Sequence, residues 1–352
     1  MSPLRVVHVV RRYGPVGGME RYVWETTQAL SDSGVQVSVL CEALHVPAPD
    51  GIEVVQLGEI APRPRWLSLM RFSRRAGRWL RETQAPGRIV HSHERLGVHD
   101  VTTFHGPPFA TIFERGWWRR ASVRVAAQLW LERRELCGPQ VRAVVPNSEL
   151  IRAQLGQYYS CIGARMAAPI PPGVDPGPAR AWREVARDGG TIGFVGKEWK
   201  RKGLDIAIRA AATLQRTRPG LELLIVGPEK QEIADLLSGS GVRARCAGWV
   251  DSASCYPQMD VLLHPARAEP YGMVIAEAMA ARVPVVISDR CGIVPVVEQS
   301  AGGAVLPLEA PVTDWAAACE AALSRTSPAP AYTRAWSQVA QEYMSLYQDL
   351  VT

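Results

Sequence analysis

Two carboxylates, Glu269 and Glu277, stand eight residues apart around a predicted helix start. Apolar residues recur at helical spacing from position 274, so Glu269 would lie in the loop before the helix and Glu277 about one and a half turns inside it. Amide groups in the first turn of a helix favour an anion, and here they belong to Gly272, Met273 and Val274. A site that binds an anion between two carboxylates, each able to accept hydrogen bonds from hydroxyl groups, suits a sugar nucleotide. The alternative is that Glu269 is only a charged loop residue and Glu277 a solvated helix residue.

The length and composition favour two domains in a cytoplasmic protein. At 352 residues the chain is too long for one ordinary core. No window approaches 18 uninterrupted apolar residues, and Arg5 and His8 interrupt the apolar start, so we expect neither a membrane span nor a signal peptide. Seven scattered cysteines without a CxxC pair predict reduced, mostly buried thiols and no zinc site.

Strands regularly separated by helices predict an α/β protein with two doubly wound domains of parallel sheet. We expect the first domain over 1–168, a linker over 169–189 and the second domain over 190–331. The linker begins where residues 169–178 contain five prolines and two glycines, which support neither a helix nor a central strand. A final helix within 332–352 has no obvious place in the second sheet, so we expect it to cross back onto the first domain.

A glycine-bearing loop follows the first predicted strand. It runs from Arg11 to Glu20 and leads into a helix, an arrangement that makes a natural anion cradle. The loop does not match GxGxxG, so it is not a dinucleotide-binding fingerprint. Ligands of doubly wound sheets bind at the carboxyl ends of the strands, and the candidate loops all fall there.

Arginines are concentrated in the first half of the chain. Seven of them share the stretch Arg63–Arg81 with large apolar residues, which predicts a basic amphipathic helix. Such a helix suits an anionic membrane surface or an anionic acceptor; the alternative is a solvated helix whose apolar side packs in the core. Trp117, beside a second tryptophan and two arginines, fits a membrane contact, a nucleic-acid contact or a helix edge over an acceptor, and the sequence does not decide among them.

Four motifs, taken in order, make the chain resemble a known enzyme family. They are Gly17-Gly18-Met19-Glu20, Thr103-Phe104-His105-Gly106, the lysine-rich stretch 196–203, and 269–277. Each motif is weak alone, but four in order at domain-sized separations form a specific pattern. The chain is similar to the family 4 nucleotide-sugar glycosyltransferases, which retain anomeric configuration, and it looks most like the lipopolysaccharide-core glucosyltransferases.

The resemblance implies the GT-B fold, in which two Rossmann-like domains face a cleft, the first binding the acceptor and the second the donor. It implies transfer of a hexose from a nucleotide diphosphate sugar, most typically a UDP-sugar, to a cell-envelope glycan or glycolipid such as lipopolysaccharide core. The chain contains no DxD motif, so we expect no metal ion, and we expect no cofactor and no nucleic-acid partner. The basic helix would hold the enzyme on the inner face of the cytoplasmic membrane.

The same resemblance assigns roles to single residues. Lys197 and Lys202, two of only four lysines, would hold the donor diphosphate, although the family commonly has arginine where Lys197 stands. Glu277 would take the ribose hydroxyls, and Glu269 and His105 would lie near the transferred sugar. The implied catalytic residues are therefore His105, Glu269 and Lys202. The implied donor set also includes Gly17, Gly18, Gly272, Met273 and Val274, and the implied acceptor set is Glu20, Arg11, Arg12 and Trp117.

Other interpretations stay open. His91 and His93 lie on one face of a predicted strand, a spacing that a metal could use, but without a third ligand we expect structural roles. The chain could be a soluble transferase that makes a small glycoside, with the arginines serving only solubility. It could also be a non-catalytic module that binds polyanions through its basic helices.

Overall fold

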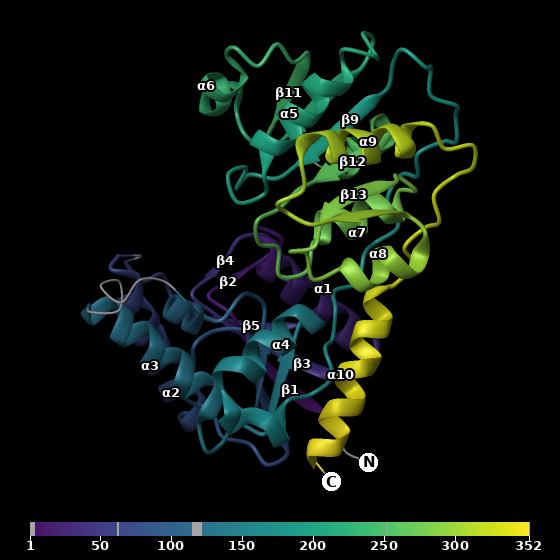
Figure 1. Cartoon of the computed structure of the whole chain (residues 1–352). Helices are drawn as coiled ribbons and strands as arrows, with labels where there is room; N and C mark the ends of the chain where they lie inside the picture. The colour runs from purple at the N-terminus through teal and green to yellow at the C-terminus, as the bar shows by residue number, and fades with distance from the viewer. Residues whose placement is uncertain (1–3, 62, 115–121, 251, 352) are drawn as a thin grey trace. The chain divides into compact units, whose positions relative to one another are not determined.

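The computed structural model describes residues 4–61, 63–114, 122–250 and 252–351 (Figure 1). The chain forms two compact units, the first made of Met1–Gly173 with Ala335–Thr352 and the second of Val174–Arg334. Each unit is built on a six-stranded sheet in which all pairings are parallel. The predicted α/β class with two doubly wound sheets is confirmed.

The sheet of the first unit has the strand order β5-β3-β1-β6-β7-β8. Its strands are β1 Arg5–Val9, β3 Gln36–Cys41, β5 Glu53–Gln56, β6 Arg88–Ser92, β7 Val101–Phe104 and β8 Ala143–Pro146. Strands β7 and β8 are buried along their whole length, and β1 and β6 along most of it. Burial on both faces explains why these strands read as nearly continuous apolar runs. A short pair, β2 Arg12–Tyr13 and β4 Ala43–Leu44, forms a separate two-stranded ladder.

Helices cover this first sheet. They are α1 Gly18–Asp32, α2 Arg65–Glu82, η1 Phe109–Glu114, α3 Val123–Cys137, α4 Glu149–Tyr158, η3 Ser160–Arg165 and α10 Trp336–Val351. Helix α10 packs against α1 and buries Trp336, Tyr343 and Tyr347, and Figure 1 shows it as the yellow helix at the end of the chain. The predicted return of the C-terminal helix to the first domain is therefore confirmed.

Helix α2 has the two faces that its sequence predicts. Leu69, Phe72, Ala76 and Leu80 are buried, while the arginines along the opposite face are exposed. An apolar side that packs in the core is sufficient to stabilise the helix, so the arginines remain available for another role. Among the described helices, none combines the length and the hydropathy that crossing a bilayer requires.

The sheet of the second unit has the strand order β11-β10-β9-β12-β13-β14. Its strands are β9 Thr191–Val195, β10 Glu222–Val226, β11 Ala244–Gly248, β12 Val261–His264, β13 Val285–Ser288 and β14 Gly303–Leu306. Its helices are α5 Leu204–Leu214, η4 Lys230–Ile233, α6 Ala234–Leu237, η5 Ser252–Ser254, η6 Tyr256–Gln258, α7 Met273–Ala280, α8 Val294–Ser300 and α9 Val312–Leu323. Trp315 of α9 is fully buried in one core of this unit, and Ile275 of α7 in the other. The two cores hold helices against the sheet.

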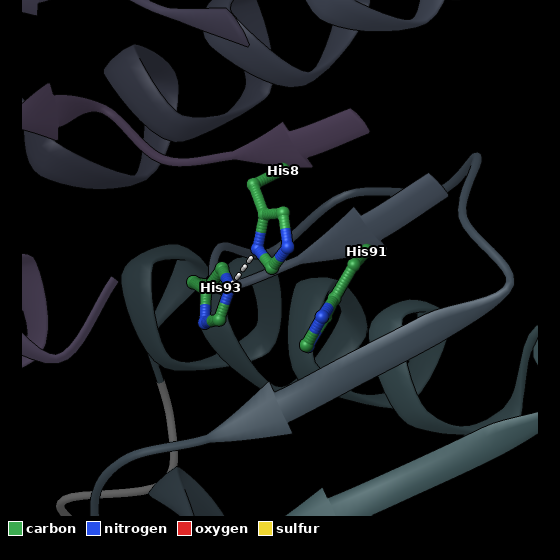
Figure 2. Close-up of side chains that lie close together, drawn as sticks. All are labelled: His8, His91 and His93. Carbon is green, nitrogen blue, oxygen red and sulfur yellow. Dashed lines mark hydrogen bonds between the residues drawn. The ribbon is translucent and has the colours of Figure 1, made fainter. Parts of the chain in front are cut away.

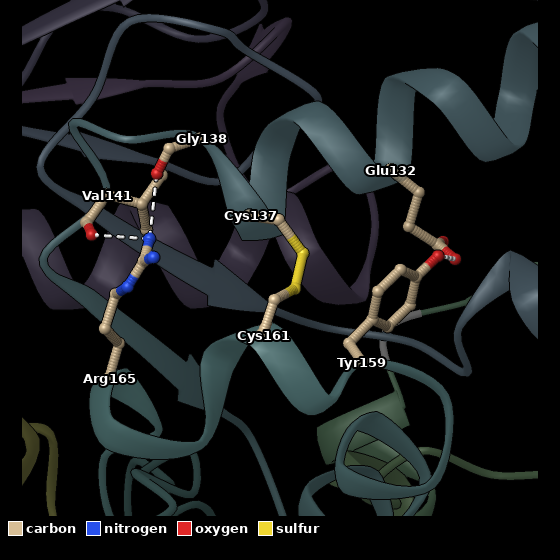
Figure 3. The surroundings of a disulfide bond; sticks show 7 residues. All are labelled: Glu132, Cys137, Gly138, Val141, Tyr159, Cys161 and Arg165. Carbon is tan, nitrogen blue, oxygen red and sulfur yellow. Dashed lines mark hydrogen bonds between the residues drawn. A yellow bond between two sulfur atoms is a disulfide. The ribbon is translucent and has the colours of Figure 1, made fainter.

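The cysteines depart from the expectation. Cys137, the last residue of α3, and Cys161 in η3 form a disulfide (Figure 3), so the prediction that all thiols are reduced is wrong at these two positions. The intervening chain forms β8 and α4 and brings η3 back to the end of α3. Arg165 fixes the same junction, because its Nη1 donates to the carbonyl oxygens of Gly138 and Val141 at 2.8 and 3.1 Å (Figure 3). Only the tertiary fold reveals this pairing.

Candidate functional site

In the second unit, the predicted donor residues follow the carboxyl ends of neighbouring strands. Lys197 and Lys202 follow β9, and Glu269 follows β12, which pairs with β9. Lys202 Nζ lies 3.0 Å from Glu269 Oε2, and the two side chains are only 12% and 11% exposed. The fold therefore joins a predicted cation to a predicted carboxylate from loops that are far apart in the sequence.

The Glu269 carboxylate has further neighbours. Arg201 Nη1 lies 3.5 Å and His264 Nε2 3.4 Å from the same oxygen, Oε2. Burial alone would raise the pKa of Glu269, but the Lys202 charge, with His264 and Arg201, holds the pKa of this carboxyl well below its usual range. Glu269 is therefore ionised at neutral pH and can accept hydrogen bonds from a ligand.

Two glycines with positive φ shape the loops around this pair. Gly196 has φ +150°, and a Cβ at this position would lie 2.1 Å from Lys202 Cδ. The missing side chain thus leaves room for the stem of Lys202. Gly272 precedes α7 with φ +114°, and a Cβ there would lie 2.7 Å from Ile275 Cδ1. Both positions need a residue that tolerates positive φ, which glycine does without steric cost.

The remaining predicted donor residues have other partners. Lys197 Nζ lies 5.6 Å from the centre of the Trp249 ring, a cation–π contact. Glu277, inside α7, accepts a hydrogen bond from the Tyr256 hydroxyl at 2.6 Å. Met273 and Val274 form the first turn of α7, as the motif predicted. Tyr256 was not among the predicted residues, because nothing in its local sequence indicates that it reaches Glu277.

A pocket of about 660 Å³ opens in the first unit, and four predicted residues line it: Arg11, Arg12, Glu20 and His105. Arg12 Nε donates to Glu20 Oε1 at 2.9 Å, and Arg11 Nε donates to Glu42 Oε2 at 2.8 Å. The predicted donor residues Gly17 and Gly18 start α1, where a Cβ at Gly17 would lie 2.4 Å from Glu20 Oε2. The carboxylate of Glu20 thus lies beside the helix start at which an anion was expected.

Four acidic residues of this pocket were not predicted from the sequence. Glu42, Glu59, Glu94 and Glu135 all line it. Glu42 and Glu94 lie just beyond the carboxyl ends of β3 and β6, so the strand-end rule that selected the glycine loop could have found them. Burial raises the pKa of Glu94 to about 7 and that of Glu135 to about 8. Carboxyls that hold a proton near neutral pH can donate as well as accept hydrogen bonds, which suits a ligand rich in hydroxyls.

His93 and His105 line the same pocket. His105 follows β7, and burial lowers its pKa to about 3, so it is neutral. His91 and His93 were expected to have structural roles, and the sequence did not indicate a third histidine beside them. The pairing of β1 with β6 places His8 opposite His91. Ring nitrogens of these three histidines lie within 4.8 Å of one another (Figure 2). Trp117 lies outside the described residues.

Two family models match the chain and together span most of it. The model described as Glycosyltransferase Family 4 matches residues 16–177, and the model described as Glycosyl transferases group 1 matches residues 189–325. The chain belongs to the family 4 glycosyltransferases. The pocket of the first unit lies mostly within the first matched region, and the pair formed by Lys202 and Glu269 lies within the second.

Curated relatives of this glycosyltransferase share about a quarter of its residues. A phosphatidyl-myo-inositol mannosyltransferase of Mycolicibacterium smegmatis is 28% identical over 313 residues, which cover 83% of this chain and 78% of the relative. A D-inositol 3-phosphate glycosyltransferase of Corynebacterium urealyticum is 24% identical over 400 residues, which cover 96% of this chain and 92% of the relative. Both relatives are named as transferases of sugars to inositol-containing acceptors.

Solved structures of other glycosyltransferases share the fold. WaaG, a glycosyltransferase involved in lipopolysaccharide biosynthesis, superimposes with a TM-score of 0.77 at 20% identity, covering 98% of each chain. HepE from Anabaena, solved with UDP-glucose, superimposes with a TM-score of 0.69 at 15% identity, covering 98% of this chain and 99% of HepE. The transferase therefore has the two-domain GT-B architecture that its motifs predicted.

Proposed function

We propose that this glycosyltransferase moves a hexose from a UDP-sugar to a hydroxyl-rich cell-envelope acceptor, with retention of anomeric configuration and without a metal ion or cofactor. The observation that carries the proposal is the buried pair of Lys202 and Glu269 beyond β9 and β12. It sets a cation and a hydroxyl acceptor side by side at the carboxyl ends of adjacent parallel strands, where ligands of such sheets bind.

The proposed donor chemistry follows from these charges. The bond between the anomeric carbon and the phosphate oxygen breaks, and negative charge develops on the departing diphosphate. Lys202 and Lys197, with the first-turn amides of α7, would stabilise that charge. The acceptor hydroxyl attacks from the same face, and its proton passes to the departing phosphate oxygen. Glu269 and Glu277 would bind sugar and ribose hydroxyls, so catalysis consists mainly of positioning and electrostatics.

The pocket of the first unit supports an acceptor with many hydroxyls and at least one negative group. Arginines and carboxyls line it together, so it offers donors and acceptors as well as positive charge. The curated relatives carry names that specify inositol phosphate and phosphatidylinositol acceptors, and WaaG is described as acting in lipopolysaccharide biosynthesis. A phosphorylated glycan or a glycolipid headgroup, such as the lipopolysaccharide core, meets these requirements.

The exposed arginines of α2 support activity at an anionic lipid surface, with the enzyme on the cytoplasmic face of the membrane. By binding this surface, they would hold the enzyme next to a lipid-linked acceptor. The alternative is a soluble transferase that makes a small glycoside, and vesicle binding separates the two.

The proposal is tested by thermal unfolding with UDP-, GDP- and ADP-glucose in turn. A ligand at one hundred times its dissociation constant stabilises a protein by about 2.7 kcal/mol, and we expect only the UDP-sugar to do so. Lys202→Ala should abolish the stabilisation, whereas Lys200→Ala should keep it, because the Lys200 side chain lies over the Trp199 ring and the bond from Arg267 goes to its backbone carbonyl, which the substitution retains. A protein that no nucleotide sugar stabilises, but that retains a polyanion through its basic helices, would instead be a binding module.

A further inference from the structure

Four histidines of the first unit lie in a connected group. His8 is on β1, His91 on β6, His93 one residue beyond β6 and His105 one residue beyond β7. Figure 2 shows three of them and the hydrogen bond that joins His8 to His93. Burial lowers the pKa of all four, so each ring is neutral and carries one N–H and one bare nitrogen. Which nitrogen carries the proton is therefore decided by the hydrogen bonds.

The tautomer of His91 follows from a chain of hydroxyl groups. The Ile170 carbonyl can only accept, so the Tyr22 hydroxyl donates to it at 3.0 Å. Each hydroxyl has one proton to give. Tyr343 must therefore donate to Tyr22 at 2.8 Å, and Thr103 must donate to Tyr343 at 2.7 Å. His91 Nε2, 2.8 Å from Thr103 Oγ1, is left as the donor of the last bond.

This assignment removes His91 from any metal site. Its Nδ1 is bare and accepts the hydroxyl of Tyr347 at 2.5 Å. Both nitrogens are thus occupied, and no lone pair remains for an ion in this arrangement. The group of His8, His91 and His93 is consequently explained by hydrogen bonds rather than by coordination.

The second chain runs from the buried sheet to the pocket. His8 Nδ1 lies 3.0 Å from His93 Nε2, and His93 Nδ1 lies 2.9 Å from His105 Nε2. His8 Nε2 is buried and has no hydrogen-bond partner among the described residues. For backbone groups a buried N–H without a partner is rarer than a buried acceptor without one, and the same preference applied to the imidazole ring makes His8 Nε2 the bare nitrogen. The proton on His8 must then be on Nδ1.

The position of the proton on His8 determines the positions of the protons on His93 and His105. His8 Nδ1–H donates to His93 Nε2, and His93 Nδ1–H donates to His105 Nε2. We propose that the buried chain of His8 and His93 fixes His105 in its Nδ1–H tautomer, so that His105 offers the pocket a hydrogen-bond donor rather than a base. His8 and His93 are then positioning residues for the transferase reaction proposed above, and the inference on their role in turnover rests on that proposed function.

The chemistry of the proposed reaction is consistent with a hydrogen-bond donor on His105. Sugar hydroxyls and phosphate oxygens all accept hydrogen bonds, and a donor held in place needs no reorganisation when charge develops. A neutral ring that is already hydrogen-bonded at Nε2 would be a poor base at neutral pH. His105 would therefore bind and orient a sugar hydroxyl or a phosphate oxygen, without removing a proton.

The direct test is the tautomer of His105 in the free enzyme, read from long-range ¹H–¹⁵N correlations of the ring nitrogens. We expect Nδ1–H in the wild-type protein. Finding Nε2–H there overturns the proposal, whether or not any variant folds. This measurement needs no sugar nucleotide, so its outcome is independent of the proposed function. If the protein has the expected tautomer but binds no UDP-sugar, the hydrogen-bond relay from His8 through His93 to His105 is supported and the proposed function is not.

Variants of His93 test the relay itself. His93→Phe removes the donor to His105 Nε2, so we expect the Nδ1–H signature to be lost, kcat to fall by about tenfold or more, and the acid limb of the kcat profile to move to higher pH. His93→Gln can still accept from His8 and donate to His105, so it should restore the tautomer and most of kcat. His99→Gln is the matched control, because His99 is buried in the same unit but bonds to the Glu135 carbonyl, outside this chain. An unchanged tautomer in a folded His93→Phe protein would refute the relay.

Discussion

Lys202 and Glu269 form a buried ion pair, with Nζ 3.0 Å from Oε2, at the carboxyl ends of two adjacent strands. Removing one partner of a buried pair leaves an uncompensated charge, which typically costs about 3 kcal/mol or more. Arg201 and His264 lie near the same oxygen and reduce that cost. We expect Lys202→Met to lower the free energy of unfolding by about 2 kcal/mol in urea denaturation, and to lower UDP-sugar turnover by orders of magnitude.

The double variant separates the structural role from the catalytic one. Lys202→Met with Glu269→Gln removes both charges, so it should regain stability but not turnover, because the diphosphate still lacks its cation. Lys200→Met, a lysine of the same loop outside the pair, should change neither quantity appreciably. If the double variant is as unstable as the single one, the pair does not act as a charge-compensated unit.

The elements that support this pair could be predicted from the sequence because their signals are local. Periodic apolar runs gave the strands, and the glycine at 272 marked the start of α7. The contact between Lys202 and Glu269 was expected only as proximity within one site, and its direct geometry depends on the pairing of β9 with β12. Gly196 matched a motif, but its reason, space for the Lys202 stem, lies in the fold.

Other features depend on strand register and chain return, which no local pattern encodes. His8 meets His91 because β1 and β6 pair in register. Cys137 meets Cys161 because the chain returns through β8 and α4. The carboxyls of the first pocket come from several loops, and Glu135 comes from a helix, so only the folded chain shows that they gather around one volume.

Glu135 should make stability depend on pH. Burial raises its pKa to about 8, with the nearby Glu132 acting in the same direction and Arg95 opposing, while its unfolded value is near 4.5. The folded state therefore binds more protons between these values, so the free energy of unfolding falls as pH rises from about 4.5 to 8. Glu135→Gln keeps the shape without the charge. We expect it to flatten this fall and to stabilise the protein at pH 8 by at least about 1 kcal/mol, measured by urea denaturation across the range.

Glu149→Gln is the matched control for this measurement, because Glu149 is an exposed glutamate of α4 with a surface partner, Arg152. It should leave the pH dependence as it is in the wild-type protein. A Glu135→Gln protein whose stability still falls with the same slope would show that other groups carry the effect.

The disulfide should stabilise the first unit. It closes a loop with a sequence separation of 24 residues, and the chain-entropy relation gives about 3 kcal/mol for a loop of this size. We expect Cys137→Ala with Cys161→Ala to unfold at lower urea concentration than the wild-type protein. Thiol labelling in denaturant without reductant should count five reactive cysteines, and with reductant all seven. A count of seven without reductant would mean that the bond does not form in solution.

The exposed arginines of α2 should govern binding to anionic lipid. Each basic side chain near such a surface contributes about 1 kcal/mol, so Arg71→Gln, Arg74→Gln and Arg78→Gln together should weaken sedimentation with phosphatidylserine vesicles by about a hundredfold. Salt should weaken the wild-type interaction, because the charges are screened. Three exposed arginines of the second unit, Arg187, Arg216 and Arg282, supply a triple-glutamine control of equal charge. Equal weakening in both triples would indicate attraction by net charge alone, whereas a loss confined to α2 makes this helix the lipid-binding surface.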